Sequence, residues 1–282
     1  MSPAALATSE NVSSPLFDYE TWEDKASAWH SEYVNSPPFP NIAIDDFISK
    51  ELARRLSTDF DQVDWQAYKH YNEDKQGGNA ATFPPLLSQV LAEFNSPRFL
   101  RLIEKISGIS KLIPDPSFGS GGIHQSKRGG FLNIHADFTV HPYHPNWHRR
   151  INLLVYLTEW QPEWGAQLEL WSTDMSKCER KIVPTAGRAA MFSTTKDSYH
   201  GHPDPMTCPD GIWRRSIALY YYTEGAVDAV ATNYQPRPDD GRVKRILISL
   251  DKFAVSVFHA TKRLFGVKDS AATSIMDKLK GK

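Results

Sequence analysis

Two hydrophobic patterns divide the chain near residue 121. Before that point, apolar residues recur with the spacing of helices rather than strands. We expect one helix from Ser49, a good N-cap, through about Phe60, and two more at Leu86–Phe94 and Arg98–Ile106. An earlier segment, Phe17–Val34, mixes acidic residues with aromatic ones, and we expect it to pack on the folded body.

After residue 121, apolar residues come in short runs rich in Val, Ile, Tyr and Phe, separated by Gly and Pro. Short strands without intervening helices indicate an antiparallel sandwich or barrel. The expected fold class is therefore mainly β with flanking helices (α+β). The expected strands lie near residues 122–127, 131–139, 150–157, 166–172, 180–184, 188–193 and 214–222.

The same patterns divide the chain into four parts. Residues 1–40 form an N-terminal arm whose Ser/Ala/Pro-rich beginning we expect to be disordered. Residues 41–225 form the folded domain, with its β core at 121–222. Residues 226–241 form a linker, because two prolines near its end oppose regular structure. Residues 242–282 form a basic amphipathic helical tail.

The tail is strongly basic, although the whole chain is nearly neutral. The 282 residues have a formal net charge of −1, but residues 241–282 hold ten basic and three acidic side chains, a net charge of +7. Leu250, Phe253, Val257 and Leu264 share one face of the expected helix. Such a helix can touch an anionic membrane surface or another subunit, or it can pack on the barrel.

Composition excludes several classes of protein. A net charge near zero gives no reason to expect nucleic acid as a partner. The longest apolar run, Ile217–Tyr222, is too short to span a membrane. Cys178 and Cys208 stand thirty residues apart and can build neither a disulfide framework nor a four-cysteine zinc site. The first residues show no secretory signal, so we expect a cytoplasmic protein.

Seven of the ten histidines lie between residues 124 and 202, among the expected strands. His135 and Asp137 are two residues apart, so on a strand both side chains point to one face and can bind one ion. This pair alone is a weak signal, because about one His-x-Asp match is expected by chance. A second match, His202-Pro-Asp204, suits a turn. A third ligand at His200 would complete the two-His, one-carboxylate set of non-haem Fe(II) oxygenases.

Oxygenases of this kind use 2-oxoglutarate, whose distal carboxylate needs a cation inside the barrel. The expected strand at 214–222 offers two arginines. Arg214 shares a face with the small residues Ser216 and Ala218, which would leave room for a ligand. Arg215 shares the other face with apolar residues that would fill a core. We choose Arg214 as the anchor and keep Arg215 as the alternate.

Five blocks of sequence resemble the 2-oxoglutarate- and Fe(II)-dependent dioxygenases of the prolyl 4-hydroxylase-like group. The blocks are Gly130–Asp137, Arg149–Leu157, Trp164–Trp171, Ser198–Pro203 and Arg214–Tyr222, and the resemblance covers roughly residues 40–225. It implies a double-stranded β-helix (jelly-roll) core with helical N-terminal support. It also implies that His135, Asp137 and His200 bind iron, and that Arg214 and Tyr156 bind 2-oxoglutarate.

This chain departs from the family pattern in places. Family members commonly have Gly-Gly-Glu-Leu where this chain has Gly-Ala-Gln-Leu at residues 165–168, a turn that should not touch the metal. The stretch between His200 and Arg214 is longer than usual, which keeps the choice between the two arginines open. The aspartate at position 137 argues against a halogenase of the same fold. Further candidates for pocket or substrate contact are Gln125, Asn152, Trp147 and His202, each with a packing or loop role as the alternative.

The expected reaction is hydroxylation of an unactivated C–H bond with release of succinate and CO2. The implied cofactors are Fe(II), 2-oxoglutarate and O2, with ascorbate as a further candidate. The partner is a small-molecule or peptidyl substrate (a peptide, amino acid, glycan or metabolite), because fold and ligands do not set specificity. The alternatives are a non-catalytic jelly-roll binding module that keeps a structural metal, and a zinc hydrolase. Neither gives Arg214 a role.

Overall fold

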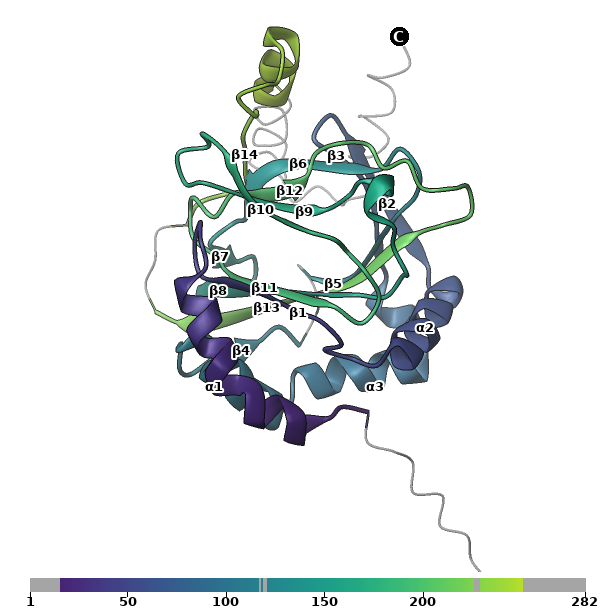
Figure 1. Ribbon diagram of the computed structural model, residues 1–282, viewed down its shortest axis with the longest axis vertical. Coiled ribbons are helices and arrows are strands. Elements are labelled where there is room, and N and C mark those ends of the chain that lie inside the picture. Colours follow the sequence, from purple (N-terminus) through teal and green to yellow (C-terminus); the bar gives the residue numbers. More distant parts are fainter. Residues whose placement is uncertain (1–15, 117, 119–120, 226–228, 251–282) are drawn as a thin grey trace, which may run out of the picture.

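The computed structural model describes residues 16–116, 118, 121–225 and 229–250, and an antiparallel sheet rolled into two facing layers forms its centre (Figure 1). The strands are β1 (Asn41–Ile44), β2 (Trp65–His70), β3 (Glu73–Gly78), β4 (Ile113–Pro114), β5 (Gly122–Ser126), β6 (Phe131–Ala136), β7 (Val140–His141), β8 (His144–Tyr156), β9 (Leu168–Trp171), β10 (Cys178–Ile182), β11 (Ala189–Ser193), β12 (His200–His202), β13 (Arg214–Glu224) and β14 (Asn233–Tyr234). Their main spatial order is β1-β11-β8-β13-β5-β3-β6-β12-β9-β10. This arrangement is a jelly roll, which the family resemblance implied and which agrees with the antiparallel sandwich or barrel expected from the strand pattern.

Strand alternation decides what each layer buries. β8 and β13 form a long antiparallel ladder in which Val155 stands opposite Ile217 and Leu153 opposite Leu219. These residues join the main apolar core, on the helix side of the sheet. The alternate residues of the same strands, Asn152 and Ser216 among them, are buried outside that core.

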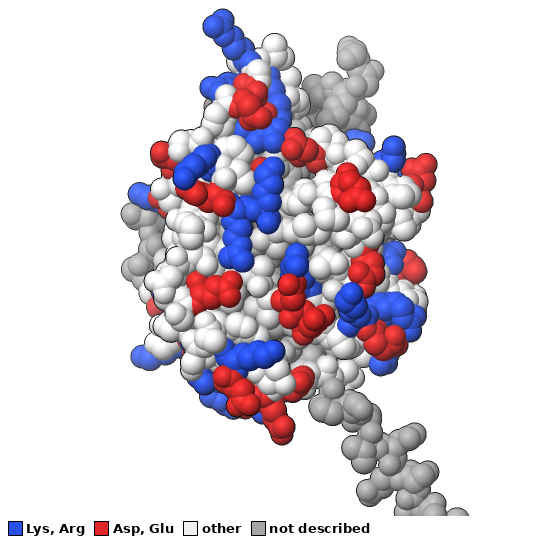
Figure 2. All heavy atoms as spheres, viewed as in Figure 1, with Lys and Arg blue, Asp and Glu red and all other residues white. Residues whose placement is uncertain are grey.

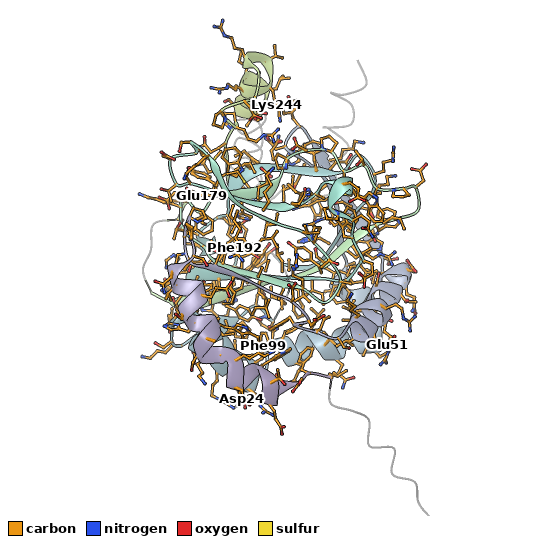
Figure 3. All side chains as sticks on the ribbon, in the orientation of Figure 1. Asp24, Glu51, Phe99, Glu179, Phe192 and Lys244 are labelled. Carbon is orange, nitrogen blue, oxygen red and sulfur yellow. The ribbon has the colours of Figure 1, made fainter. Side chains whose placement is uncertain are left out.

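Helices cover the outer face of the layer that holds β8 and β13 (Figure 1). They are α1 (Tyr19–Asn35), α2 (Lys50–Asp59), α3 (Pro85–Phe94) and α4 (Pro97–Ser107). Phe99 lies between the helices and the sheet, whereas Phe192 lies between the two sheet layers (Figure 3). The helices therefore supply one wall of the core and leave the space between the sheet layers to other residues.

The helices agree closely with the sequence. The hydroxyl of Ser49 accepts a hydrogen bond from the backbone N–H of Leu52, which confirms it as the N-cap of α2. α3 and α4 fall within two residues of the expected segments, and Gly108 ends α4 in the left-handed conformation at φ 74°. The segment around Phe17 does pack on the body, and residues 19–35 form the helix α1.

The β2–β3 hairpin was not expected. β3 pairs with both β5 and β6 and stands in the middle of the sheet. Its sequence, Glu-Asp-Lys-Gln-Gly-Gly, has none of the β-branched or aromatic residues that indicate a strand. Hydrogen bonding to its neighbours, rather than local preference, fixes its conformation.

The expected linker is held against the barrel over part of its length. Tyr234 of β14 stands opposite His135 of β6, and Arg237 forms an ion pair with Asp204 at 2.8 Å. Residues 242–250 are helical, in agreement with the start of the expected tail helix, and expose the apolar side chains of Val243, Ile246 and Leu250. The rest of the tail, residues 251–282, and the N-terminal residues 1–15 lie outside the described residues.

The surface fits the near-zero net charge. Figure 2 shows acidic and basic side chains interspersed over the face drawn there. In the part of the chain that the structure describes, no helix is both long and apolar enough to cross a membrane. Cys178 and Cys208 are both free thiols.

Candidate metal centre

His135, Asp137 and His200 meet between the sheet layers. β12 pairs with β6 so that His200 stands directly opposite His135, and Asp137 follows the last residue of β6. The Nε2 atom of His135 lies 3.5 Å from Oδ1 of Asp137, and the Nε2 atom of His200 lies 3.7 Å from Oδ2. One ligand atom from each residue lies within 4.8 Å of the others, and all three residues are buried. One ion can therefore contact all three.

Backbone carbonyls orient both imidazoles. The Nδ1 atom of His135 lies 2.9 Å from the carbonyl oxygen of Asn133, and the Nδ1 atom of His200 lies 2.9 Å from that of Ser198. With the proton on Nδ1 donated to the carbonyl, the lone pair on Nε2 faces the cluster. This is the arrangement in which histidine binds a metal.

The protonation states also suit a metal. Burial, and then the neighbouring His135, lower the pKa of His200 to about 4. Burial alone would raise the pKa of Asp137, but the Arg149 guanidinium and the two histidines hold it well below its usual value. A neutral imidazole and an ionised carboxylate are the forms that bind a divalent cation, so this donor set fits Fe(II).

Arg149 and Asn152 of β8 hold the carboxylate of Asp137. The Nη1 atom of Arg149 lies 2.8 Å from Oδ2, and the amide of Asn152 donates to the same oxygen at 3.2 Å. Arg149 is fully buried, with its guanidinium between the rings of Phe138 and Tyr220 at 3.8 and 3.6 Å. Sequence reasoning missed Arg149, because only the register of β8 shows which of two adjacent arginines turns inward.

Arg214 and Tyr156 form a second buried group. The guanidinium carbon of Arg214 lies 5.0 Å from the centre of the Tyr156 ring, and burial lowers the pKa of Arg214. Among the described residues, the Tyr156 hydroxyl has no hydrogen-bond partner. A buried arginine beside an unsatisfied hydroxyl is suited to binding a carboxylate.

The departure at the family's Gly-Gly turn lies beside this group. Ala166 has a positive φ of 57°, a conformation that glycine adopts more readily. Its carbonyl oxygen is 3.4 Å from Nε of Arg214. Ala166 therefore belongs to the surroundings of Arg214.

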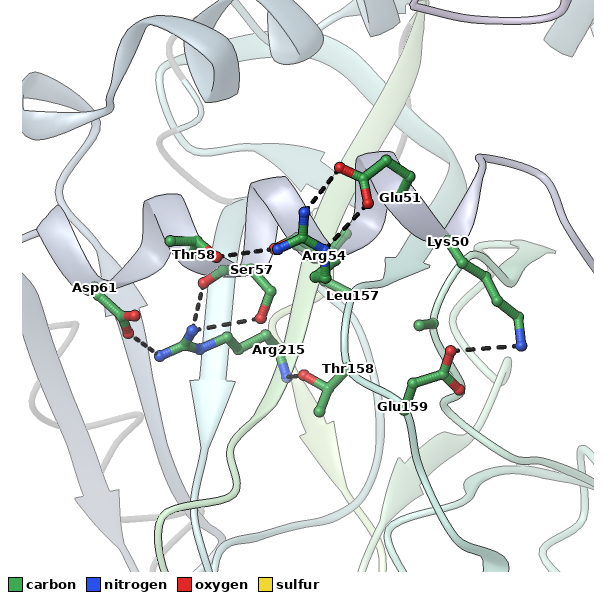
Figure 4. A pocket seen from close by; sticks show the side chains of 11 residues that line it. Lys50, Glu51, Arg54, Ser57, Thr58, Asp61, Leu157, Thr158, Glu159 and Arg215 are labelled. Atoms are coloured by element: carbon green, nitrogen blue, oxygen red, sulfur yellow. Dashed lines mark hydrogen bonds and ion pairs between the residues drawn. The ribbon is translucent and has the colours of Figure 1, made fainter.

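Arg215 points the other way, toward α2 (Figure 4). Its guanidinium contacts the carboxylate of Asp61 and the backbone carbonyl of Ser57 in a surface pocket. Gln125 lies on this side as well, because its amide oxygen accepts from Nε of Arg215 at 3.3 Å. The geometry thus favours packing for Gln125 and separates the two arginines to opposite sides of β13.

The structure adds two inward residues that the sequence did not single out. His124 stands opposite Ser216 in the β5–β13 ladder, and burial together with Lys75 lowers its pKa to about 3. Lys75 comes from β3 and forms an ion pair with Glu73 at 2.9 Å. Alternation along β5 could have indicated His124, but nothing in the polar sequence of β3 pointed to Lys75.

The other two candidates lie at different depths. His202 is buried, and its Nδ1 atom has no hydrogen-bond partner among the described residues. Trp147 lies further out, opposite Glu224, and stacks on His144 with 4.1 Å between ring centres. Trp147 is two residues before Arg149 on β8. Trp147 is therefore nearer the start of β8 than Arg149, the residue that contacts Asp137.

The chain is similar to known proteins in part of its sequence and in its fold. Residues 121–222 match the model of the 2OG-Fe(II) oxygenase superfamily. A search of curated protein sequences found no match.

Solved structures share the fold at low sequence identity. A prolyl hydroxylase from Trichoplax adhaerens, in complex with a hypoxia inducible factor peptide fragment, has a TM-score of 0.50 and 16% identity, over 72% of this chain and 93% of that chain. A prolyl-4-hydroxylase from Pseudomonas putida has a TM-score of 0.49 and 18% identity, over 71% of this chain and 100% of that chain. HygX from Streptomyces hygroscopicus, with nickel and 2-oxoglutarate bound, has a TM-score of 0.47 and 12% identity, over 67% and 92%. At 16% identity the likeness to the Trichoplax adhaerens structure shows the fold alone.

Proposed function

We propose that the protein is a hydroxylase whose iron is held by His135, Asp137 and His200, and the premise is the match of residues 121–222 to the model of the 2OG-Fe(II) oxygenase superfamily. The family match confirms the expected enzyme class and its use of Fe(II) and 2-oxoglutarate. The observation that carries the proposal is the buried His-Asp-His cluster, with its Nε2 atoms and carboxylate facing one another.

We assign the binding of 2-oxoglutarate to the side chains of Arg214 and Tyr156. The support is the burial of both side chains, the unsatisfied Tyr156 hydroxyl and the lack of a carboxylate on Arg214 among the ion pairs of the described residues. A guanidinium can donate two hydrogen bonds to the distal carboxylate, and the hydroxyl can donate a third. Arg215 is already engaged with Asp61 and Ser57, which favours Arg214 over its neighbour.

When bound, Fe(II) and 2-oxoglutarate supply the oxidising chemistry: O2 is consumed, 2-oxoglutarate is converted to succinate and CO2, and one oxygen enters a substrate C–H bond. The chain's own residues hold and orient the side chains that bind the metal. The carbonyls of Asn133 and Ser198 fix the two imidazoles, and Arg149 holds the carboxylate of Asp137 in place. The two sheet layers exclude water from the reacting atoms.

The substrate class is a peptide or a small molecule. A similar fold from Trichoplax adhaerens was solved with a peptide fragment, which keeps peptides in consideration. Trp147, with its ring stacked on His144 toward the start of β8, is the side chain we propose to contact substrate.

The test uses purified protein with Fe(II), 2-oxoglutarate and a library of peptides, amino acids, glycans and metabolites. We expect succinate release and, for the true substrate, a mass gain of one oxygen. His135→Ala should lower iron affinity at least tenfold, because even the loss of a residue that only supports a metal ligand costs about that much. His148→Ala, on the same sheet but outside the cluster, is the control. The proposal fails if wild-type protein neither releases succinate nor binds 2-oxoglutarate, and His135→Ala leaves iron occupancy unchanged.

A further inference from the structure

The two oxygens of the Asp137 carboxylate have different surroundings. Oδ2 lies 2.8 Å from Nη1 of Arg149 and accepts a hydrogen bond from Asn152 at 3.2 Å. Oδ1 lies 3.5 Å from Nε2 of His135. The Nε2 atom of His200 lies 3.7 Å from Oδ2, so each oxygen faces one histidine at a similar distance. The two oxygens differ because only Oδ2 also contacts Arg149 and Asn152 of β8.

The contact between Arg149 and Oδ2 of Asp137 is costly to break. The side chain is fully buried, and aromatic rings cover both faces of the guanidinium at 3.6 and 3.8 Å. A buried charge is costly unless it is paired, and Asp137 is the counter-ion. If Oδ2 moved to a metal, the guanidinium would lose its ion pair in a place that water does not reach.

We propose that Arg149 and Asn152 are positioning residues that restrict Asp137 to one metal bond, through Oδ1. This inference rests on the proposed function, because it concerns how Asp137 meets the iron. A carboxylate can bind a metal through one oxygen or two, and the second bond uses up a coordination position. Restricting Asp137 to Oδ1 keeps open the positions that 2-oxoglutarate and O2 require.

The proposal makes an unusual prediction for Arg149→Met. The methionine side chain has no charge and no hydrogen-bond donor. Freed from Arg149, Oδ2 can bind the metal as well, so metal affinity should stay the same or increase. Binding of 2-oxoglutarate should weaken by about tenfold or more, the size of effect expected from a residue that orients a metal ligand. A residue that merely fills space would change neither affinity.

Arg150→Met is the matched control. Arg150 is the next residue, and its guanidinium contacts the hydroxyl of Thr223 at 3.3 Å rather than Asp137. Two measurements separate the roles without turnover. The first is the Mn(II) dissociation constant of the metal-free full-length protein, by electron paramagnetic resonance. The second is the 2-oxoglutarate dissociation constant of the anaerobic Fe(II) protein, from its visible charge-transfer absorption. Arg150→Met should match wild type in both.

Asn152→Leu provides a second variant that removes only the weaker of the two contacts to Oδ2. It should shift the two constants in the same directions as Arg149→Met, by a smaller factor. If Arg149→Met does not fold, as judged by circular dichroism, Asn152→Leu decides by the same criteria.

Three results are informative in different ways. Unchanged constants in both variants would overturn the proposal, because the contacts would then serve packing only. A parallel loss of metal and 2-oxoglutarate would overturn it too, since Arg149 would then support metal binding rather than limit it. If wild-type protein itself binds neither Mn(II) nor 2-oxoglutarate, the proposed function fails first.

Discussion

The two faces of β13 show how differently one strand can use neighbouring residues. On the helix side, Ile217 and Leu219 are almost completely buried in the main apolar core. On the other side, Arg214 and Ser216 are also buried, yet they are polar. β8 repeats the contrast, with Leu153 in the core and Asn152 on Asp137. A step of one residue separates the part that stabilises the fold from the part that performs chemistry.

The physical consequence is that stability and ligand binding should respond to different substitutions. Burial of apolar side chains on the helix side is favourable in itself. Burial of Arg149 and Arg214 on the other side is unfavourable unless each finds a partner. Arg149 has the Asp137 carboxylate, whereas the contacts of Arg214 in the described residues are the Tyr156 side chain and one carbonyl.

The largest expected effect breaks the helix-side face. Ile217→Ala should lower the free energy of unfolding by about 2–5 kcal/mol, because it leaves a cavity in a close-packed core. The remaining folded protein should bind 2-oxoglutarate with wild-type affinity. Ser216→Ala, the adjacent residue on the other face, should cost far less stability. Urea unfolding measures both variants, and equal losses would contradict the division between the faces.

A sharper test replaces an arginine by methionine on each face of β13 in turn. Arg214→Met should weaken 2-oxoglutarate binding about 100-fold, or about 2.7 kcal/mol, because it removes the proposed partner of the distal carboxylate. The stability of the ligand-free protein should stay the same or rise, because a poorly paired buried charge is removed.

Arg215→Met should do the reverse. It removes contacts to Ser57 and to the exposed Asp61, which should cost about 1 kcal/mol of stability and leave 2-oxoglutarate affinity unchanged. Calorimetric titration of the Fe(II) protein and urea unfolding together give the comparison. A loss of 2-oxoglutarate affinity in Arg215→Met, with none in Arg214→Met, would reverse the assignment.

The helix-side face was predicted well because the alternation of apolar residues along a strand is visible in the sequence itself. The same alternation placed Arg214 with Ser216 and Arg215 with Ile217, in agreement with the structure. His135 and His200 could be paired only as a hypothesis, since their meeting depends on the β6–β12 register, sixty-five residues apart in the chain.

The rest could not be read from the sequence for a related reason. A strand that lines a polar interior need not carry apolar residues, so the sequence of β3 with Lys75 carries no strand signal. Arg149 and Arg150 are chemically identical neighbours, and a register shift between β8 and β13 lies close to them. Which of the two turns toward Asp137 is therefore a property of the assembled sheet.

The smallest expected effect is on how the stability of the protein depends on pH. His124 has a pKa of about 3 in the folded protein, owing to burial and then to Lys75, whereas an exposed histidine has about 6.5. As pH falls below about 6.5, the unfolded chain takes up a proton that the folded protein does not. The metal-free protein should therefore lose stability through this residue between pH 6.5 and 3, by about 1.4 kcal/mol per pH unit. His124→Gln cannot take up that proton in either state, so its stability should fall less steeply with pH in urea unfolding of metal-free samples. Identical slopes for the variant and wild type would show that His124 titrates alike in both states, and that the polar interior does not exclude its charge.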